Sequence, residues 1–225
     1  MSNPKLIDER IYLLAVSKLP RKDDEFMRSR KMRGFSLIEL MAVVLIIMVV
    51  ASIAVMSLQP ALKYSRVNNG YNITMATIRQ ARDYAIGQRQ QYFVTFSNAS
   101  VPNTITITQS GTGTVISTYQ LPTDVTFAVV AGIPTAANKT PDGFGTGGTA
   151  IDFDQAITGG VKNVIYFMPD GTAQDLNGNV NNGVIYIARA GELYSSHAIT
   201  VWGATGRLRG WRLFSTGGNA YWRQN

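Results

Sequence analysis

The sequence predicts an α+β protein in which a long N-terminal helix packs on an antiparallel β-sandwich-like domain. Three observations lead to this fold class. An apolar run covers residues 35–58, apolar side chains recur every three to four positions over residues 61–90, and the period changes to two from Gln91 onward. A helix followed by many short strands is typical of a helix that covers antiparallel sheets. With 225 residues, the chain is long enough for one or two small domains.

Positive charge is concentrated just ahead of the apolar run. The chain has 21 Lys and Arg residues against 14 Asp and Glu residues, a formal net charge of +7. Residues 1–26 are balanced, whereas residues 27–34 contain four cations and no acid: Arg28, Arg30, Lys31 and Arg33. More than half of the net charge therefore lies in a short N-terminal segment, so the total alone does not indicate a nucleic-acid partner.

Residues 35–58 are predicted to form a transmembrane helix. The run holds 24 residues and one charge, Glu39. As a helix it is about 36 Å long at about 1.5 Å per residue, and the hydrocarbon core of a bilayer is about 30 Å thick. The basic flank predicts a cytoplasmic N-terminus and a domain on the other side of the membrane.

Two simpler explanations of this run remain as alternatives. A removable secretory signal has an apolar region of about 7 to 15 residues and a small-x-small cleavage site, whereas Ser57-Leu58-Gln59-Pro60 is a poor site. A plain signal anchor accounts for the length but not for Glu39. An acid at the centre of a membrane helix costs about 2.5 to 3.5 kcal/mol on insertion scales, and less near its end.

Residues 59–90 are predicted to continue the same helix as an amphipathic half. Its apolar positions recur at helical spacing and are separated by charged residues; they are Val67, Tyr71, Met75, Ile78, Ala81 and Ala85. Asn68, Asn69 and Gly70 are weak helix formers and mark a candidate interruption.

Residues 91–225 are predicted to form a β-rich domain. Alternating segments are separated by turn residues such as Pro169-Asp-Gly171 and Asn177-Gly178. We expect strands near residues 92–96, 105–107, 115–119, 125–129, 164–168, 184–187, 199–202 and 207–214.

The residue types needed for most catalytic sites are missing. The chain has no Cys and one His, His197, which argues against disulfides, thiolate metal sites and cysteine nucleophiles. Asp152 and Asp154 lack the partners of a catalytic carboxylate pair. The glycine-rich residues 143–148 lack the end of a phosphate loop, and residues 175–183 lack the Gly and Glu of a calcium loop. We therefore predict no enzyme activity, no metal and no cofactor.

The C-terminal residues carry a cationic and aromatic pattern. No acid follows Glu192, whereas the four arginines after it are Arg207, Arg209, Arg212 and Arg223. In a strand, Arg207, Arg209 and Trp211 share one face, which suits phosphates and exposed bases. The alternative is that the arginines protect a sheet edge from aggregation while the Trp residues pack in the core.

The N-terminal junction resembles the class III leader of type IV pilins and type II secretion pseudopilins. The matching residues are Lys31-Met-Arg-Gly34, then Phe35-Ser-Leu-Ile-Glu39-Leu and an unbroken apolar helix. The resemblance implies that a prepilin peptidase cleaves between Gly34 and Phe35 and that the new Phe35 amine is methylated. It also implies that Glu39 pairs with the Phe35 amine of a neighbouring subunit, which gives a buried charge a partner.

Two features depart from the family pattern. Residues 1–34 make a long leader, and Met27 is an alternative start that leaves the expected eight residues. The helix-kinking Pro of the family falls at Met56 in this chain, which has Pro60 instead.

The order of the later segments is similar to that of the H-type minor pseudopilins and the related FimT minor pilins. This resemblance implies a non-enzymatic filament subunit that assembles through its helix with other pseudopilins or pilins for protein secretion. It also implies a single-pass location in bacterial inner-membrane lipid, with residues 91–225 in the periplasm. Gly206-Arg-Leu-Arg209 resembles a Gly-Arg-x-Arg pattern associated with DNA uptake in FimT-type pilins. The alternative function is therefore DNA binding through Arg207, Arg209, Trp211 and Arg212.

Overall fold

A computed structural model describes residues 34–136, 138–153 and 163–225 of the chain. The expected leader, the alternative start at Met27 and the carboxylate of Asp154 lie outside these residues. By its internal contacts the chain divides into two units, residues 1–53 and residues 54–225.

The described part of the first unit is the start of one helix, α2, which spans Leu37–Gln88. Every side chain from residue 34 to residue 62 is exposed. Among the described residues, α2 is the one helix long and apolar enough to cross a membrane, with a mean hydropathy of 2.9 in its most apolar window. A helix with an apolar surface is stable in lipid, because its backbone N–H and C=O groups hydrogen-bond to one another and need no water.

The second unit contains two antiparallel sheets. One has the strand order β3-β2-β1-β6-β7, and the other has the order β11-β10-β9-β8-β4 with β5 also paired to β8. The strands of the first sheet are β1 Tyr92–Ser97, β2 Thr104–Gln109, β3 Val115–Gln120, β6 Val164–Phe167 and β7 Ala173–Gln174. Those of the second are β4 Thr126–Phe127, β5 Ile151–Asp152, β8 Gly183–Ala188, β9 His197–Trp202, β10 Arg207–Thr216 and β11 Asn219–Gln224.

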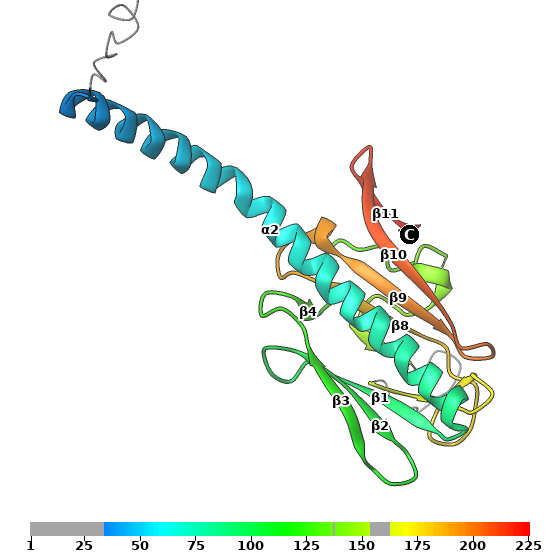
Figure 1. Ribbon diagram of the computed structural model, residues 1–225. Coiled ribbons are helices and arrows are strands. Elements are labelled where there is room, and N and C mark those ends of the chain that lie inside the picture. Colours follow the sequence, from blue (N-terminus) through cyan, green and yellow to red (C-terminus); the bar gives the residue numbers. More distant parts are fainter. Residues whose placement is uncertain (1–33, 137, 154–162) are drawn as a thin grey trace, which may run out of the picture. The chain divides into compact units, whose positions relative to one another are not determined.

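The C-terminal half of α2 packs on both sheets (Figure 1). Its buried side chains include Val67, Ile78 and Ala81, which join one core with apolar residues of β1, β2, β8 and β9. The predicted helical face is therefore confirmed, with Tyr71 partly buried at its margin. The fold class predicted from the sequence, a long helix on antiparallel sheets, is confirmed as well.

The candidate interruption at residues 68–70 is absent, because α2 runs through it. Gly70 is buried where the helix meets the segment before β4. A Cβ atom there would lie 2.9 Å from Val125 Cγ1. Gly70 therefore allows α2 to approach the sheet closely. The gain from this packing outweighs the low helix propensity of glycine.

The last strand, β11, was not expected from the sequence. It pairs with β10 through a tight turn at Gly217 and Gly218, whose φ angles are +58° and +83°. A Gly-Gly pair between two strands is a known hairpin signal, because both residues of such a turn take positive φ. The two glycines were the available signal for this hairpin.

The second sheet is covered on both faces. One face meets α2, and the other packs against residues from the segment 129–144 through Val184, Tyr186 and Leu213. All side chains of β8 are buried as a result. A short 3-10 helix, η2 (Pro141–Gly143), lies in this covering segment, and a second, η3 (Leu193–Ser195), precedes β9.

Candidate functional site

The predicted processing junction lies at the start of α2. Gly34, Phe35 and Ser36 precede the helix, and Glu39 lies in its first turn. The Leu40 amide donates to the Ser36 carbonyl at 3.0 Å, so the first turn is already closed at this point. An acid in the first turn is favourable, because it faces the positive end of the helix dipole. Phe35 is 79% exposed and Glu39 is exposed, which leaves both available to another molecule.

The four predicted DNA-binding residues do not form one free surface. Arg207, Arg209 and Trp211 share a face of β10, as expected from the alternation of a strand, but Val129, Ile133 and Phe144 pack on that side of the sheet. Arg209 Nη1 donates to Asp142 Oδ1 at 2.6 Å, and its guanidinium lies 5.4 Å from the Trp202 ring centroid. The predicted grouping is corrected accordingly: Arg209 is held in an intramolecular ion pair.

Trp211 is also engaged within the protein. Its indole Nε1 donates to Thr200 Oγ1 at 3.2 Å, and its ring packs against the cluster that contains Tyr186 and Leu213. A half-buried ring with its N–H already bonded is a packing residue rather than a free platform for a base. The alternative considered from the sequence, in which the Trp residues pack in the core, describes this residue correctly.

Asp142 is the ion-pair partner of Arg209, and the sequence analysis did not predict this contact. Its side chain is 4% exposed and accepts hydrogen bonds from Arg209, from the Trp202 indole at 3.1 Å and from the Thr200 hydroxyl. It has a φ of +53°, a conformation that Asp tolerates better than most residues. The turn signal Pro141-Asp142-Gly143 is visible in the sequence, but its contact with a strand almost seventy residues later is not.

Gly145 allows the covering segment to reach the sheet. Its φ is +76°, and a Cβ atom would lie 2.5 Å from Val184 Cγ1. The glycine-rich residues 143–148 therefore serve close packing on β8.

Arg212 lies on the opposite face of β10, toward α2. Its guanidinium stands 4.5 Å from the Tyr64 ring centroid and donates to the Tyr64 hydroxyl. It also lies 5.1 Å from the Phe214 ring. The structure thus separates Arg212 from Arg207 by the thickness of the sheet and by five positions along the strand.

A recess of about 360 Å³ brings Arg207 together with two arginines of α2, Arg79 and Arg82, and one acid, Asp83, also lines it. Arg82 is oriented by two backbone carbonyls, because its Nε donates to Gly171 at 3.1 Å and its Nη2 to Thr205 at 3.1 Å. The guanidinium groups of Arg79 and Arg207 make no hydrogen bond or ion pair with any described residue. Sequence reasoning did not foresee this grouping, because the helix and the strand are more than a hundred residues apart.

Gly206 is required for the shape of this recess. Its φ is +60°, and a Cβ atom would lie 2.0 Å from the Gly171 carbonyl oxygen and 2.6 Å from Arg82 Nε. The Gly-Arg pair at residues 206–207 therefore has a structural reason. Gly206 permits the close approach to Gly171 and Arg82, and Arg207 follows it at the edge of the recess.

The other polar candidates have local roles. Burial raises the pKa of the Asp175 carboxyl, but hydrogen bonds from Asn179 and Asn177 outweigh it, and the pKa lies below its ordinary value. These bonds close a turn within the loop that faintly resembles a calcium site. Within the described residues, no three His, Asp or Glu side chains gather as a ligand set.

His197 is buried beneath α2 and stacks near Tyr71, with the ring centroids 5.1 Å apart. Its Nδ1 donates to the Ser195 carbonyl at 2.9 Å. Burial lowers the pKa of the imidazole; the Ser195 bond opposes this, and the nearby Arg212 adds to it. His197 is therefore a core residue.

Comparison with known proteins bears first on the N-terminus. Residues 29–55 match the family model described as the prokaryotic N-terminal methylation motif. The N-terminal segment is of the prepilin type. The type IV pilin-like resemblance predicted from the sequence is thereby confirmed for this segment, and the motif implies processing by a prepilin peptidase and assembly with other pilins.

The other comparisons concern solved structures and curated protein sequences. A crystal structure of the type IV minor pilin FimU from Pseudomonas aeruginosa (strain PAO1) is similar over 72% of this chain and 95% of that one, at 11% identity and a TM-score of 0.41. At these values no functional conclusion is drawn from the similarity. A comparison with curated protein sequences gives no match.

Proposed function

We propose that this chain is a minor pseudopilin or minor pilin, a subunit that acts by entering a filament and not by catalysis. The observation that carries the proposal is the methylation motif at residues 29–55, followed without a break by a long apolar helix with Glu39 in its first turn. In this proposal the prepilin peptidase cuts after Gly34, Phe35 becomes the methylated N-terminus, and Glu39 pairs with the Phe35 amine of a neighbour.

The proposal includes a cellular location and a filament type. The chain crosses the bacterial inner membrane once, with the leader in the cytoplasm and the β-rich domain in the periplasm, as the basic flank supports. The filament is a type II secretion pseudopilus or a related type IV pilus-like fibre, and the subunit is of the H/FimT type. The exposed apolar surface of α2 supports assembly by helix packing, because each subunit can cover the surface of the next.

Replacing Gly34 by alanine tests the processing step. In cells that contain a prepilin peptidase, we expect the wild-type chain to lose its leader and the Gly34→Ala chain to accumulate uncut. Intact-protein mass spectrometry of the membrane fraction measures both species and also identifies the start as Met1 or Met27. Gly111→Ala is the matched control, because a Cβ at Gly111 meets nothing within 4 Å. Normal processing of Gly34→Ala contradicts the proposal.

DNA binding is the second candidate function, and the arginine recess is the observation that favours it. Arg79 and Arg207 present guanidinium groups that are free of partners among the described residues, beside the oriented Arg82. Guanidinium forks match phosphate geometry, so the recess suits the backbone of a duplex. In this revised form the DNA surface consists of Arg79, Arg82 and Arg207, while Arg209, Trp211 and Arg212 lie outside it.

The double variant Arg79→Gln/Arg207→Gln tests this candidate. If two phosphate contacts are lost, the slope of log affinity against log salt concentration should fall in magnitude by about 2, since each contact contributes about 0.9. Fluorescence anisotropy with a labelled duplex, at several low salt concentrations, measures the slope. Lys139→Gln/Arg223→Gln removes the same charge from other exposed positions and is the control. Undetectable wild-type binding, or an equal loss in both double variants, rejects the candidate.

A further inference from the structure

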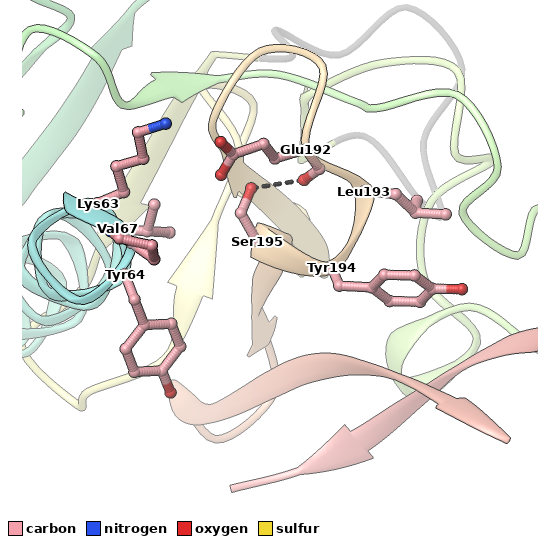
Figure 2. Close-up of a pocket in the computed structure, with 8 residues that line it drawn as sticks. Lys63, Tyr64, Val67, Glu192, Leu193, Tyr194 and Ser195 are labelled. Carbon is pink, nitrogen blue, oxygen red and sulfur yellow. Dashed lines mark hydrogen bonds between the residues drawn. The ribbon is translucent and has the colours of Figure 1, made fainter. Parts of the chain in front are cut away.

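A cavity of about 450 Å³ lies between α2 and the segment that precedes β9. Figure 2 shows Lys63, Tyr64 and Val67 of the helix on one side and Glu192 to Ser195 on the other. Apolar and aromatic residues make most of the wall: Pro60, Tyr64, Val67, Leu193 and Tyr194. Tyr64 is 41% exposed and Tyr194 is 48% exposed, so both rings stand at the surface beside the opening.

The cavity lies close to the end of the apolar run, which determines the part of a membrane that it faces. The apolar run ends at Leu58, and Pro60 already belongs to the wall. Tyr64 follows Leu58 by six residues, which is about 9 Å along a helix. The headgroup layer on each side of the hydrocarbon core is about 5 to 7 Å thick. If residues 35–58 span the bilayer, the cavity borders the headgroups, where Tyr and Trp side chains are enriched.

The charges around the cavity favour an anion. The Lys63 ammonium makes no hydrogen bond or ion pair with any described residue. The carboxylate in the wall, Glu192, is already bonded to Arg189 at 2.6 Å. On the other side of Tyr64, Arg212 contacts the ring, and Arg223 lies 5.8 Å from the Phe214 ring. Cations and aromatic rings are thus gathered at the end of the apolar run.

We propose that this cavity is a phospholipid site that holds the domain against the membrane surface. Lys63 binds the phosphate of the headgroup, and the glycerol and the first acyl carbons pack against Pro60, Val67 and Leu193. The site rests on the membrane anchoring included in the proposed function, but not on leader cleavage or filament assembly. It is separate from the arginine recess, because the two share no lining residue.

A lipid titration of the full-length chain in neutral detergent micelles tests the site. The chain has no native Cys, so Ala190→Cys, at an exposed position two residues before Glu192, carries a single environment-sensitive fluorophore. An anionic phospholipid with a nitroxide on its headgroup should quench this fluorophore saturably. In Lys63→Gln, the lipid fraction at half-quenching should rise about fivefold, since each cation near an anionic surface contributes about that factor.

Three controls decide the outcome. Arg79→Gln removes the same charge elsewhere on α2 and should titrate like the wild type. Lys63→Arg keeps the charge and should also titrate like the wild type, which separates loss of the charge from a folding defect. Inorganic phosphate should not compete at the ionic strength used. The proposal is overturned if wild-type quenching is absent, if Lys63→Gln titrates normally, or if quenching depends on the ratio of protein to micelle, which indicates a second copy in the cavity.

Discussion

The Glu39→Val chain should insert into the membrane as well as the wild type and enter filaments at least tenfold less efficiently. Insertion should not suffer, because valine removes an acid whose presence in lipid is unfavourable. Assembly should suffer because the Phe35 amine of the neighbouring subunit loses its partner, and removing one member of a buried ion pair costs about 3 to 5 kcal/mol. Glu39 is exposed in the isolated chain, so this loss arises only between molecules.

Quantitative immunoblotting measures the effect, with sheared filaments compared against the membrane fraction of the same cells. Glu39→Gln is the informative companion, since it keeps the size and polarity of the side chain and removes its charge. We expect it to assemble almost as poorly as Glu39→Val. Wild-type assembly of the glutamine variant would show that the charge has no role, and a chain absent from the membrane would show that the defect precedes assembly.

Asp142→Ala should destabilise the β-rich domain by about 2 to 4 kcal/mol. Alanine removes the acceptor for Arg209, Thr200 and the Trp202 indole at once. The Thr200 side chain is fully buried, and its donor would lose its partner, a loss of about 1 to 3 kcal/mol for a buried polar group. The Arg209 side chain is 27% exposed, so water reduces the cost of leaving that charge unpaired.

Urea unfolding of the full-length chain in micelles, followed by Trp fluorescence, measures this change. Asp83→Ala is the matched control, because Asp83 is exposed on α2 and such substitutions stay within about 0.5 kcal/mol. In the Arg209→Ala background, Asp142→Ala should cost clearly less than in the wild type. Equal costs in the two backgrounds would contradict the ion pair, and a cost as small as that of Asp83→Ala would contradict the role of Asp142 altogether.

The arginine pattern illustrates how a correct local inference leaves the surroundings of each side chain undetermined. Arg207, Arg209 and Trp211 do share one face of a strand, because the alternation of side chains is a property of the backbone. Whether that face is open depends on which segment covers it. Val129, Ile133 and Phe144 cover it in the structure, and Asp142 forms an ion pair with Arg209. Arg207, at the end of the same strand, is left beside Arg79 and Arg82.

The sequence by itself determined the long helix, its apolar and amphipathic halves and most of the strands. These features depend on composition and periodicity over neighbouring residues, and an amphipathic pattern needs no knowledge of its partner. The prepilin-type N-terminus was predicted from its resemblance to a family, and the methylation motif at residues 29–55 agrees with it. Only the tertiary structure decided which cations are free. Arg209 is neutralised by an acid distant in sequence, whereas Lys63, Arg79 and Arg207 have no such partner among the described residues. The energy of a charge depends on what lies within a few ångströms, and long-range packing alone brings those groups together.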